Sequence, residues 1–187
     1  MQGYLHSIKK GQSSLELKIN LPNLRTKNRE DMKIKIKHID WQPYYVPVVR
    51  KKVIKGMRVV EPPTAKDPLE QSCGCVIMDA VLKLLATGKY FSVNKISYAI
   101  GCTPTEISSA VGLAMGMPLT DLIDAYRLKR TCELLCYTDI TGVGIAKLCG
   151  FANYNSFSKF FVRETRYTPF AYRRRHQPAD FKFIYEW

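Results

Sequence analysis

The spacing of apolar positions changes once along this chain, from an alternating pattern to a helical one. Near the N-terminus, residues 15–21 and 32–37 alternate apolar and polar side chains, as strands with one buried and one exposed face do. Two more apolar runs, at residues 44–49 and 53–60, predict further strands. We therefore expect residues 1–60 to form a small, basic, β-rich region.

A proline-rich linker at residues 61–72 separates this region from a helical part that begins at Cys73. The apolar residues then follow the period of an amphipathic helix, and a long helix is predicted from Leu119 to Tyr137. Shorter helices are bounded by residue types that cap helix ends. The predicted N-caps are Ser92, Thr103, Thr141 or Asp139, and Thr168, with Pro104 and Pro169 in first turns and Gly88 and Gly116 at C-terminal ends.

Two segments of the helical part repeat one another, each with a short helix, a glycine turn and a second helix. Ile96 and Gly101 of the first segment correspond to Ile145 and Gly150 of the second, whose turn is one residue longer. In the second helix of the second segment, aromatic side chains occupy one face and polar side chains the other. A DNA-recognition helix needs two such faces, because one packs in a core while the other reaches base edges in the major groove.

The second repeat and the long helix carry motifs of a known family. The motifs are Ile145–Phe151, Ser156–Phe161, Thr168–Pro169 and Tyr172–Arg173, with Arg127–Leu128 and Leu134–Leu135 in the long helix. On these motifs, residues 76–175 resemble the DNA-binding domain of AraC/XylS-type transcription regulators. The resemblance implies a mainly α fold over residues 73–176, with seven helices in two helix-turn-helix units joined by a rigid helix. Residues 177–187 would be a tail.

The resemblance also implies that both recognition helices enter successive major grooves, whose segments on one face of DNA recur about 34 Å apart. The residues expected to read bases are Tyr154, Asn155, Ser158 and Lys159 in the second unit and Thr105, Ser108 and Ser109 in the first. Asn pairs with adenine, Lys donates to guanine, and Ser suits either. Tyr154 suits a thymine methyl, a phosphate or packing on the core.

The two units differ in charge. Residues 89–118 carry two Lys and one Glu, whereas residues 139–175 carry seven Lys and Arg and two acidic residues. We therefore expect the second unit to supply most of the affinity. Basic side chains position a protein on phosphates, and the candidates are Arg163, Arg173, Arg174, Lys147 and Arg166. The family usually has glycine where Arg166 stands, so this residue is expected at a positive φ or at a differently shaped helix end.

Composition narrows the class of protein. The 187 residues include 29 Lys and Arg against 16 Asp and Glu, a formal charge of +13, which suits a polyanionic partner. No apolar run approaches the roughly 20 residues that span a bilayer, so we expect no membrane partner and a cytoplasmic, nucleoid-associated location. The six cysteines and three histidines lack zinc-site spacing. No metal, cofactor or catalytic residue is expected, and the chain is predicted not to be an enzyme.

The sequence thus predicts a sequence-specific transcription regulator that binds promoter DNA and contacts RNA polymerase. Three roles stay open for the N-terminal region, namely homodimerisation by strand pairing, additional DNA contact, or docking on another protein. The alternative is a DNA-architectural or mobile-element-associated protein without effector sensing. The weakly basic first unit, and an N-terminal region shorter than a sensor barrel, favour that alternative to some degree.

Overall fold

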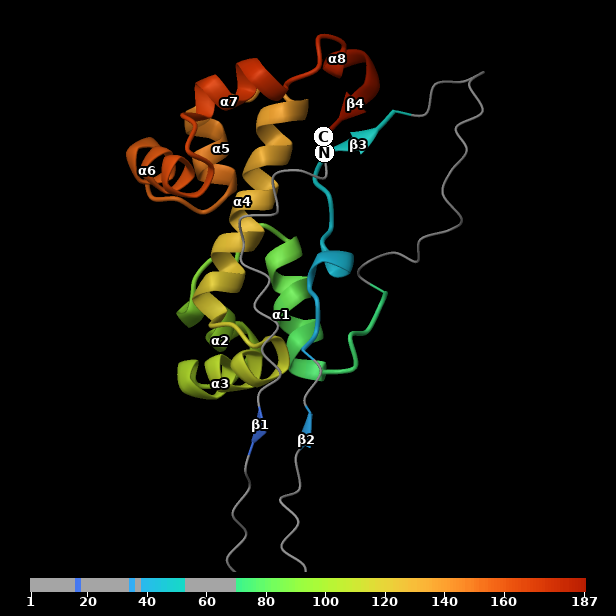
Figure 1. Ribbon diagram of the computed structural model, residues 1–187, viewed down its shortest axis with the longest axis vertical. Coiled ribbons are helices and arrows are strands. Elements are labelled where there is room, and N and C mark those ends of the chain that lie inside the picture. The colour runs from blue at the N-terminus through green and yellow to red at the C-terminus, as the bar shows by residue number, and fades with distance from the viewer. Residues whose placement is uncertain (1–15, 18–33, 36–37, 53–69) are drawn as a thin grey trace, which may run out of the picture.

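The computed structural model describes residues 16–17, 34–35, 38–52 and 70–187, and eight α-helices lie within them (Figure 1). They are α1 (Val76–Ala86), α2 (Val93–Ile100), α3 (Pro104–Met115), α4 (Leu119–Tyr137), α5 (Gly142–Leu148), α6 (Tyr154–Thr165), α7 (Pro169–His176) and α8 (Phe181–Ile184). The first seven are the helices predicted for residues 73–176, and the mainly α fold class is confirmed.

The helices begin where short polar side chains satisfy free backbone N–H groups. The side chains of Ser92, Thr103, Thr141 and Thr168 each accept a hydrogen bond from a backbone N–H in the first turn of α2, α3, α5 and α7. Thr141, and not Asp139, is therefore the cap of α5. The turn glycines Gly101 and Gly150 have φ of 79° and 71°, a left-handed conformation that glycine adopts without steric cost.

Helix α4 joins the two helix-turn-helix units, α2–α3 and α5–α6 (Figure 1). One end of α4 packs with α1, α2 and α3 around a core that includes Met78, Leu85, Ile96, Ile107 and Leu122. The other end packs with α5, α6 and α7 around a core that includes Leu134, Ile145, Cys149, Phe157 and Phe161. A single 19-residue helix therefore contributes side chains to both cores.

Residues 38–52, here called the strap, run along the two units and not away from them (Figure 1). Trp41 and Tyr45 are buried in the first core and Val49 in the second. The carboxylate of Glu133 on α4 accepts hydrogen bonds from the Tyr45 hydroxyl and from Val49 N, the latter at 2.7 Å. Burial, followed by the nearby Glu133 carboxylate, raises the pKa of Tyr45. The strap is thus part of the helical domain.

The strand predicted at residues 44–49 is wrong. Residues Gln42–Tyr44 form a 3₁₀ helix, and the first regular pairing after it is β3 (Arg50–Lys51), antiparallel to β4 (Tyr185–Glu186). Pro43 and Pro47 have no N–H to donate to a strand ladder, and the apolar side chains of this segment pack on helices. Residues 177–187 were predicted as a tail, but residues 181–186 form α8 and β4, and β4 pairs with β3.

Two short strands lie within the alternating segments near the N-terminus, where strands were predicted. Strand β1 (Glu16–Leu17) pairs antiparallel with β2 (Ile34–Lys35), with Glu16 opposite Lys35. The strand predicted at residues 53–60 and most of the linker predicted at 61–72 lie outside the described residues. No helix within the described ranges is long and apolar enough to cross a membrane.

Candidate nucleic-acid interface

Helix α6 is anchored by its aromatic face. Phe157 and Phe161 are fully buried and Phe160 is 7% exposed. The helix begins at Asn153, whose Oδ1 accepts a hydrogen bond from Ser156 N at 2.8 Å. Burial of three phenylalanines on one side fixes which side faces outward, so the remaining residues of α6 are presented in a defined orientation.

The outward face of α6 carries the predicted base-reading residues. Asn155 and Lys159 are exposed, and Ser158 between them is partly buried. Tyr154 is 38% exposed, and its ring packs edge-on against Phe157 with 5.8 Å between ring centroids. Asn155 and Lys159 are four residues, or about one helical turn, apart. Their amide and ammonium are the polar groups of this face best suited to base edges.

Each position of α3 corresponds to the position of α6 that lies fifty residues further along the chain. Both begin at an N-cap, Thr103 and Asn153, and both end at a residue in the left-handed region, Gly116 and Arg166. Hydrogen bonds from the backbone N–H and hydroxyl of Thr103 lower the pKa of Glu106, which completes a capping box. The two predicted recognition helices are therefore equal in length and end in the same way.

The outward face of α3 differs from that of α6 in chemistry. Ile107 and Val111 are fully buried, while Thr105 and Ser109 are exposed and Ser108 is partly buried. The positions of Asn155 and Lys159 on α6 thus correspond to Thr105 and Ser109 on α3. Hydroxyl groups replace an amide and an ammonium, as the sequence indicated.

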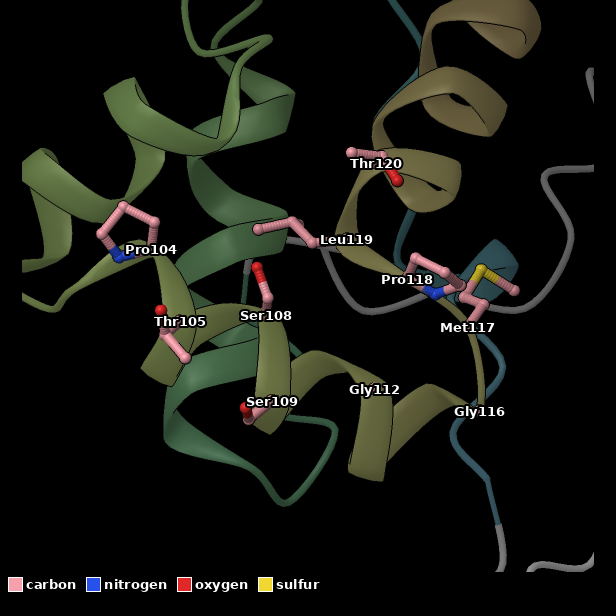
Figure 2. Close-up of a pocket in the computed structure, with 10 residues that line it drawn as sticks. All are labelled: Pro104, Thr105, Ser108, Ser109, Gly112, Gly116, Met117, Pro118, Leu119 and Thr120. Carbon is pink, nitrogen blue, oxygen red and sulfur yellow. The ribbon is translucent and has the colours of Figure 1, made fainter.

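A shallow hollow of about 720 Å³ lies beside this face of α3 (Figure 2). Figure 2 shows α3 on one side of it and the start of α4 on the other. It is lined by Pro104, Thr105, Ser108, Ser109, Gly112, Gly116, Met117, Pro118, Leu119 and Thr120. No lining residue carries a charge, so the three predicted base-reading residues of the first unit share an uncharged, concave surface.

Three of the predicted phosphate-binding residues lie on the surface. Lys147 in the last turn of α5 and Arg174 on α7 are exposed. Arg166 is exposed as well, and its φ is 65°. The positive φ expected from the missing family glycine is therefore present, and α6 ends at the same position as α3.

The other two predicted phosphate-binding residues have partners within the protein, and of these Arg163 is also exposed, by 63%. Arg173 donates from Nη2 to the carbonyl oxygen of Ile140 at 2.6 Å and from Nε to that of Leu135 at 3.3 Å, and burial lowers its pKa. Arg163 is paired with Glu164 at 2.6 Å and with Asp124 of α4 at 3.4 Å. Arg173 therefore joins α7 to the end of α4, and Arg163 joins α6 to its middle. Sequence spacing carries no signal for these tertiary partners.

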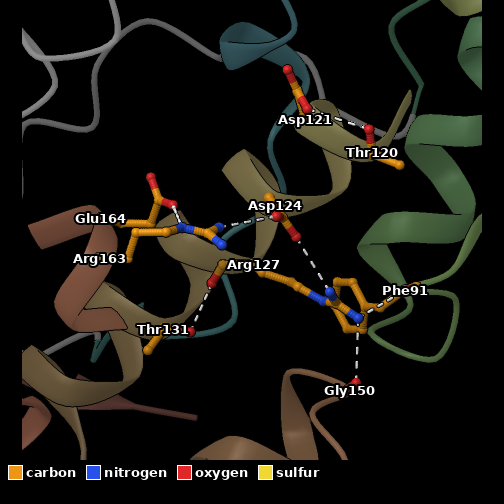
Figure 3. Close-up of polar contacts among 9 residues, drawn as sticks. All are labelled: Phe91, Thr120, Asp121, Asp124, Arg127, Thr131, Gly150, Arg163 and Glu164. Carbon is orange, nitrogen blue, oxygen red and sulfur yellow. Dashed lines mark hydrogen bonds and ion pairs between the residues drawn. The ribbon is translucent and has the colours of Figure 1, made fainter. Parts of the chain in front are cut away.

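Arg127 is a residue whose role the sequence did not reveal. Its Nη2 donates to the carbonyl oxygens of Phe91 at 2.6 Å and Gly150 at 3.3 Å, and its Nη1 contacts Asp124 at 3.3 Å (Figure 3). The guanidinium also lies 5.4 Å from the ring of Phe91 and 5.0 Å from that of Phe151. One side chain of α4 thus bonds the segment preceding α2 and the turn of the second unit, which fixes the two units relative to each other.

The Cys73–Gly74–Cys75 segment immediately precedes α1, and Cys75 is its N-cap residue. The carboxylate of Asp79 accepts hydrogen bonds from Cys73 N at 2.8 Å and from the Ser72 hydroxyl. Within the part of the chain that the structure describes, no group of three or more His, Cys, Asp or Glu side chains is arranged to hold a metal ion.

Comparison with known proteins identifies a helix-turn-helix segment in the C-terminal half of the chain. A family model for the helix-turn-helix domain matches residues 96–175. That segment begins in α2 and ends in α7, and it contains both recognition helices and α4. No curated protein matches the chain in sequence.

Two solved structures that resemble this chain are distant from it in sequence. The C-terminal domain of AraT, a response regulator from Geobacillus stearothermophilus, is 19% identical with a TM-score of 0.51, over 56% of this chain and 88% of that one. A transcriptional regulator with an AraC-type DNA-binding domain from Chromobacterium violaceum is 21% identical with a TM-score of 0.48, over 55% and 94%. At this level of identity, the likeness to the AraT domain shows a shared fold.

Proposed function

We propose, from the premise that residues 96–175 are a helix-turn-helix domain of the AraC type, that this chain is a sequence-specific transcription regulator of promoter DNA. Helices α3 and α6 enter successive major grooves on one face of the duplex, and α4 holds them at the required spacing. The predicted partner is double-stranded DNA, and the formal charge of +13 suits it.

The observation that carries the proposal is the division of α6 into two faces. Three buried phenylalanines hold the helix, and Asn155 and Lys159 are exposed on the opposite side. Asn can accept from and donate to adenine at once, and Lys donates to the acceptors of guanine. Lys147, Arg163, Arg166 and Arg174 are the proposed phosphate contacts, because their side chains are exposed.

Further steps of regulation belong to the same proposal. A protein bound at a promoter acts by contacting RNA polymerase, and β1 with β2 offers a strand pair through which two copies can associate. The place of action is the nucleoid in the cytoplasm.

The second candidate, a DNA-architectural or mobile-element protein, is favoured by one observation, namely that the outward face of α3 has no basic residue.

A matched pair of variants tests the main proposal. Lys159→Ala removes a base contact, and we expect it to lower the affinity for the preferred duplex by about 1–3 kcal/mol while random duplex binds nearly as before. Lys147→Ala removes a phosphate contact, so it should weaken binding to both duplexes by the same factor. Titrations at one fixed salt concentration measure both ratios. An unchanged ratio of specific to random affinity in Lys159→Ala would mean that α6 does not read bases.

A further inference from the structure

We propose that the first helix-turn-helix unit reads thymine through its C5 methyl group, using the hollow beside α3. This inference rests on the proposed function and adds a base preference for one half of the binding site. The hollow lies between α3 and the start of α4 (Figure 2). The hollow opens on the face of α3 that corresponds to the face of α6 where Asn155 and Lys159 lie.

The lining of the hollow determines which base edge it fits. Guanine and cytosine are read best by charged groups, Arg or Lys for guanine and Asp or Glu for cytosine, and the lining has none. Thymine presents a methyl group beside one acceptor, O4. Apolar groups of Met117 and Pro118 together with the hydroxyls of Ser108 and Ser109 match that combination.

The shape of α3 supports close approach. Gly112 lies in the last turn of the helix, and a Cβ added there would meet no atom within 4 Å. The equivalent residue on α6 is Val162, which is 38% exposed. A glycine at this position leaves room for a methyl group next to the helix backbone, whereas α6 fills the same place with its own side chain.

Charge points the same way. Residues 89–118 carry only two Lys and one Glu, so phosphate attraction contributes little to holding this unit on DNA. Burial of apolar surface is then its main source of affinity, and a thymine methyl is the largest apolar group that a base pair exposes in the major groove.

The test exchanges thymine for uracil, which removes only the methyl group. The duplex contains two half-sites, the first bound by α3 and the second by α6. Each buried methyl lost from the first half-site should lower the affinity about fourfold. The same exchange in the second half-site is the matched control and should lower the affinity by less, because Asn155 and Lys159 read bases there through hydrogen bonds. Replacing that thymine with cytosine should also lower the affinity. Replacing it with 5-methylcytosine, which restores the methyl group, should recover part of the lost affinity.

Two protein variants check that the hollow is responsible. Gly112→Leu fills it, and we expect a loss on the order of tenfold with the two-half-site duplex, because a thymine contact is excluded. A duplex with only the second half-site should bind this variant as it binds the unsubstituted protein. Ser108→Ala with Ser109→Ala removes the hydroxyls proposed to donate to O4, so it should lower the affinity for the two-half-site duplex, while the loss on uracil exchange stays about fourfold because it comes from the methyl group.

The outcomes separate this inference from the function on which it rests. If no duplex is preferred over random DNA, the proposed function fails. If a duplex is preferred but uracil exchange in its first half-site has no effect, the thymine inference alone is overturned. A footprint that covers only the second half-site also overturns it, and would leave the hollow to an apolar segment of a protein partner.

Discussion

The ring of Phe91, which precedes the first helix-turn-helix unit, lies against Gly150, the turn glycine of the second. A Cβ on Gly150 would come within 2.6 Å of the Phe91 ring, and Gly150 has a φ of 71°. Together with the Arg127 guanidinium, which bonds the carbonyl oxygens of both residues, this contact joins the two units directly. The orientation of α3 relative to α6 therefore depends on a few atoms around one glycine.

Gly150→Ala should destabilise the protein by more than the equivalent change in the first unit. Gly101 has a φ of 79° but open space around its Cβ position, so Gly101→Ala adds only the left-handed strain of about 1–2 kcal/mol. Gly150→Ala adds the clash with Phe91 to the same strain. Chemical denaturation of both variants measures the difference, and equal losses would show that Phe91 yields without cost.

Arg127→Lys should uncouple the two units. An ammonium keeps the positive charge but cannot span two carbonyl oxygens as a planar guanidinium does. We expect a loss of about 1–3 kcal/mol in unfolding free energy. The affinity for a duplex with two half-sites should also fall more than that for a half-length duplex. Equal losses with both duplexes would contradict a role in setting the spacing.

Arg166→Gly should stabilise the protein by about 1 kcal/mol, because a non-glycine residue in the left-handed region carries strain. Its counterpart on α3 is Gly116, with a φ of 67° against 65° for Arg166. Arg166→Ala is the control, since it removes the same side chain but keeps the strain. A gain in melting temperature for both variants would assign the effect to the charge of Arg166 and not to its backbone.

Trp41→Ala should destabilise the helical domain, although Trp41 lies outside the predicted domain boundaries. Its side chain is 5% exposed and packs with Tyr45 and Tyr126. Truncation of a buried aromatic residue costs about 3–5 kcal/mol. Gln42→Ala, at an exposed neighbouring position, should change stability by less than about 0.5 kcal/mol. A small effect of Trp41→Ala would mean that the strap is not part of the cooperative fold.

The helices between Val76 and His176 were predictable because their signals are local. Ser92, Thr103 and Thr168 cap the helices they were expected to cap, and the bounds predicted for α4, Leu119 and Tyr137, are those observed. An N-cap and the period of apolar residues act within one or two turns, so the neighbouring sequence contains the information needed.

The strap and the arginine partners were not predictable from the same signals. The hydroxyl of Tyr45 meets the carboxylate of Glu133, 88 positions further along the chain. A run of apolar residues at 44–49 reads equally as a strand or as an irregular segment that packs on helices. In the candidate site, the exposure of Asn155 and Lys159 follows from helical period, whereas the internal partners of Arg173 exist only after folding.

Selection from a random pool of duplexes with the full chain, at one fixed salt concentration and followed by sequencing, measures base reading by both units directly. Two recognition helices in successive major grooves should enrich a motif of two segments about 10–10.5 base pairs apart. The first segment should favour thymine, and the second should favour adenine and guanine on the strand that α6 contacts. Tight, salt-sensitive binding without enrichment of any motif would contradict sequence-specific reading and favour an architectural protein.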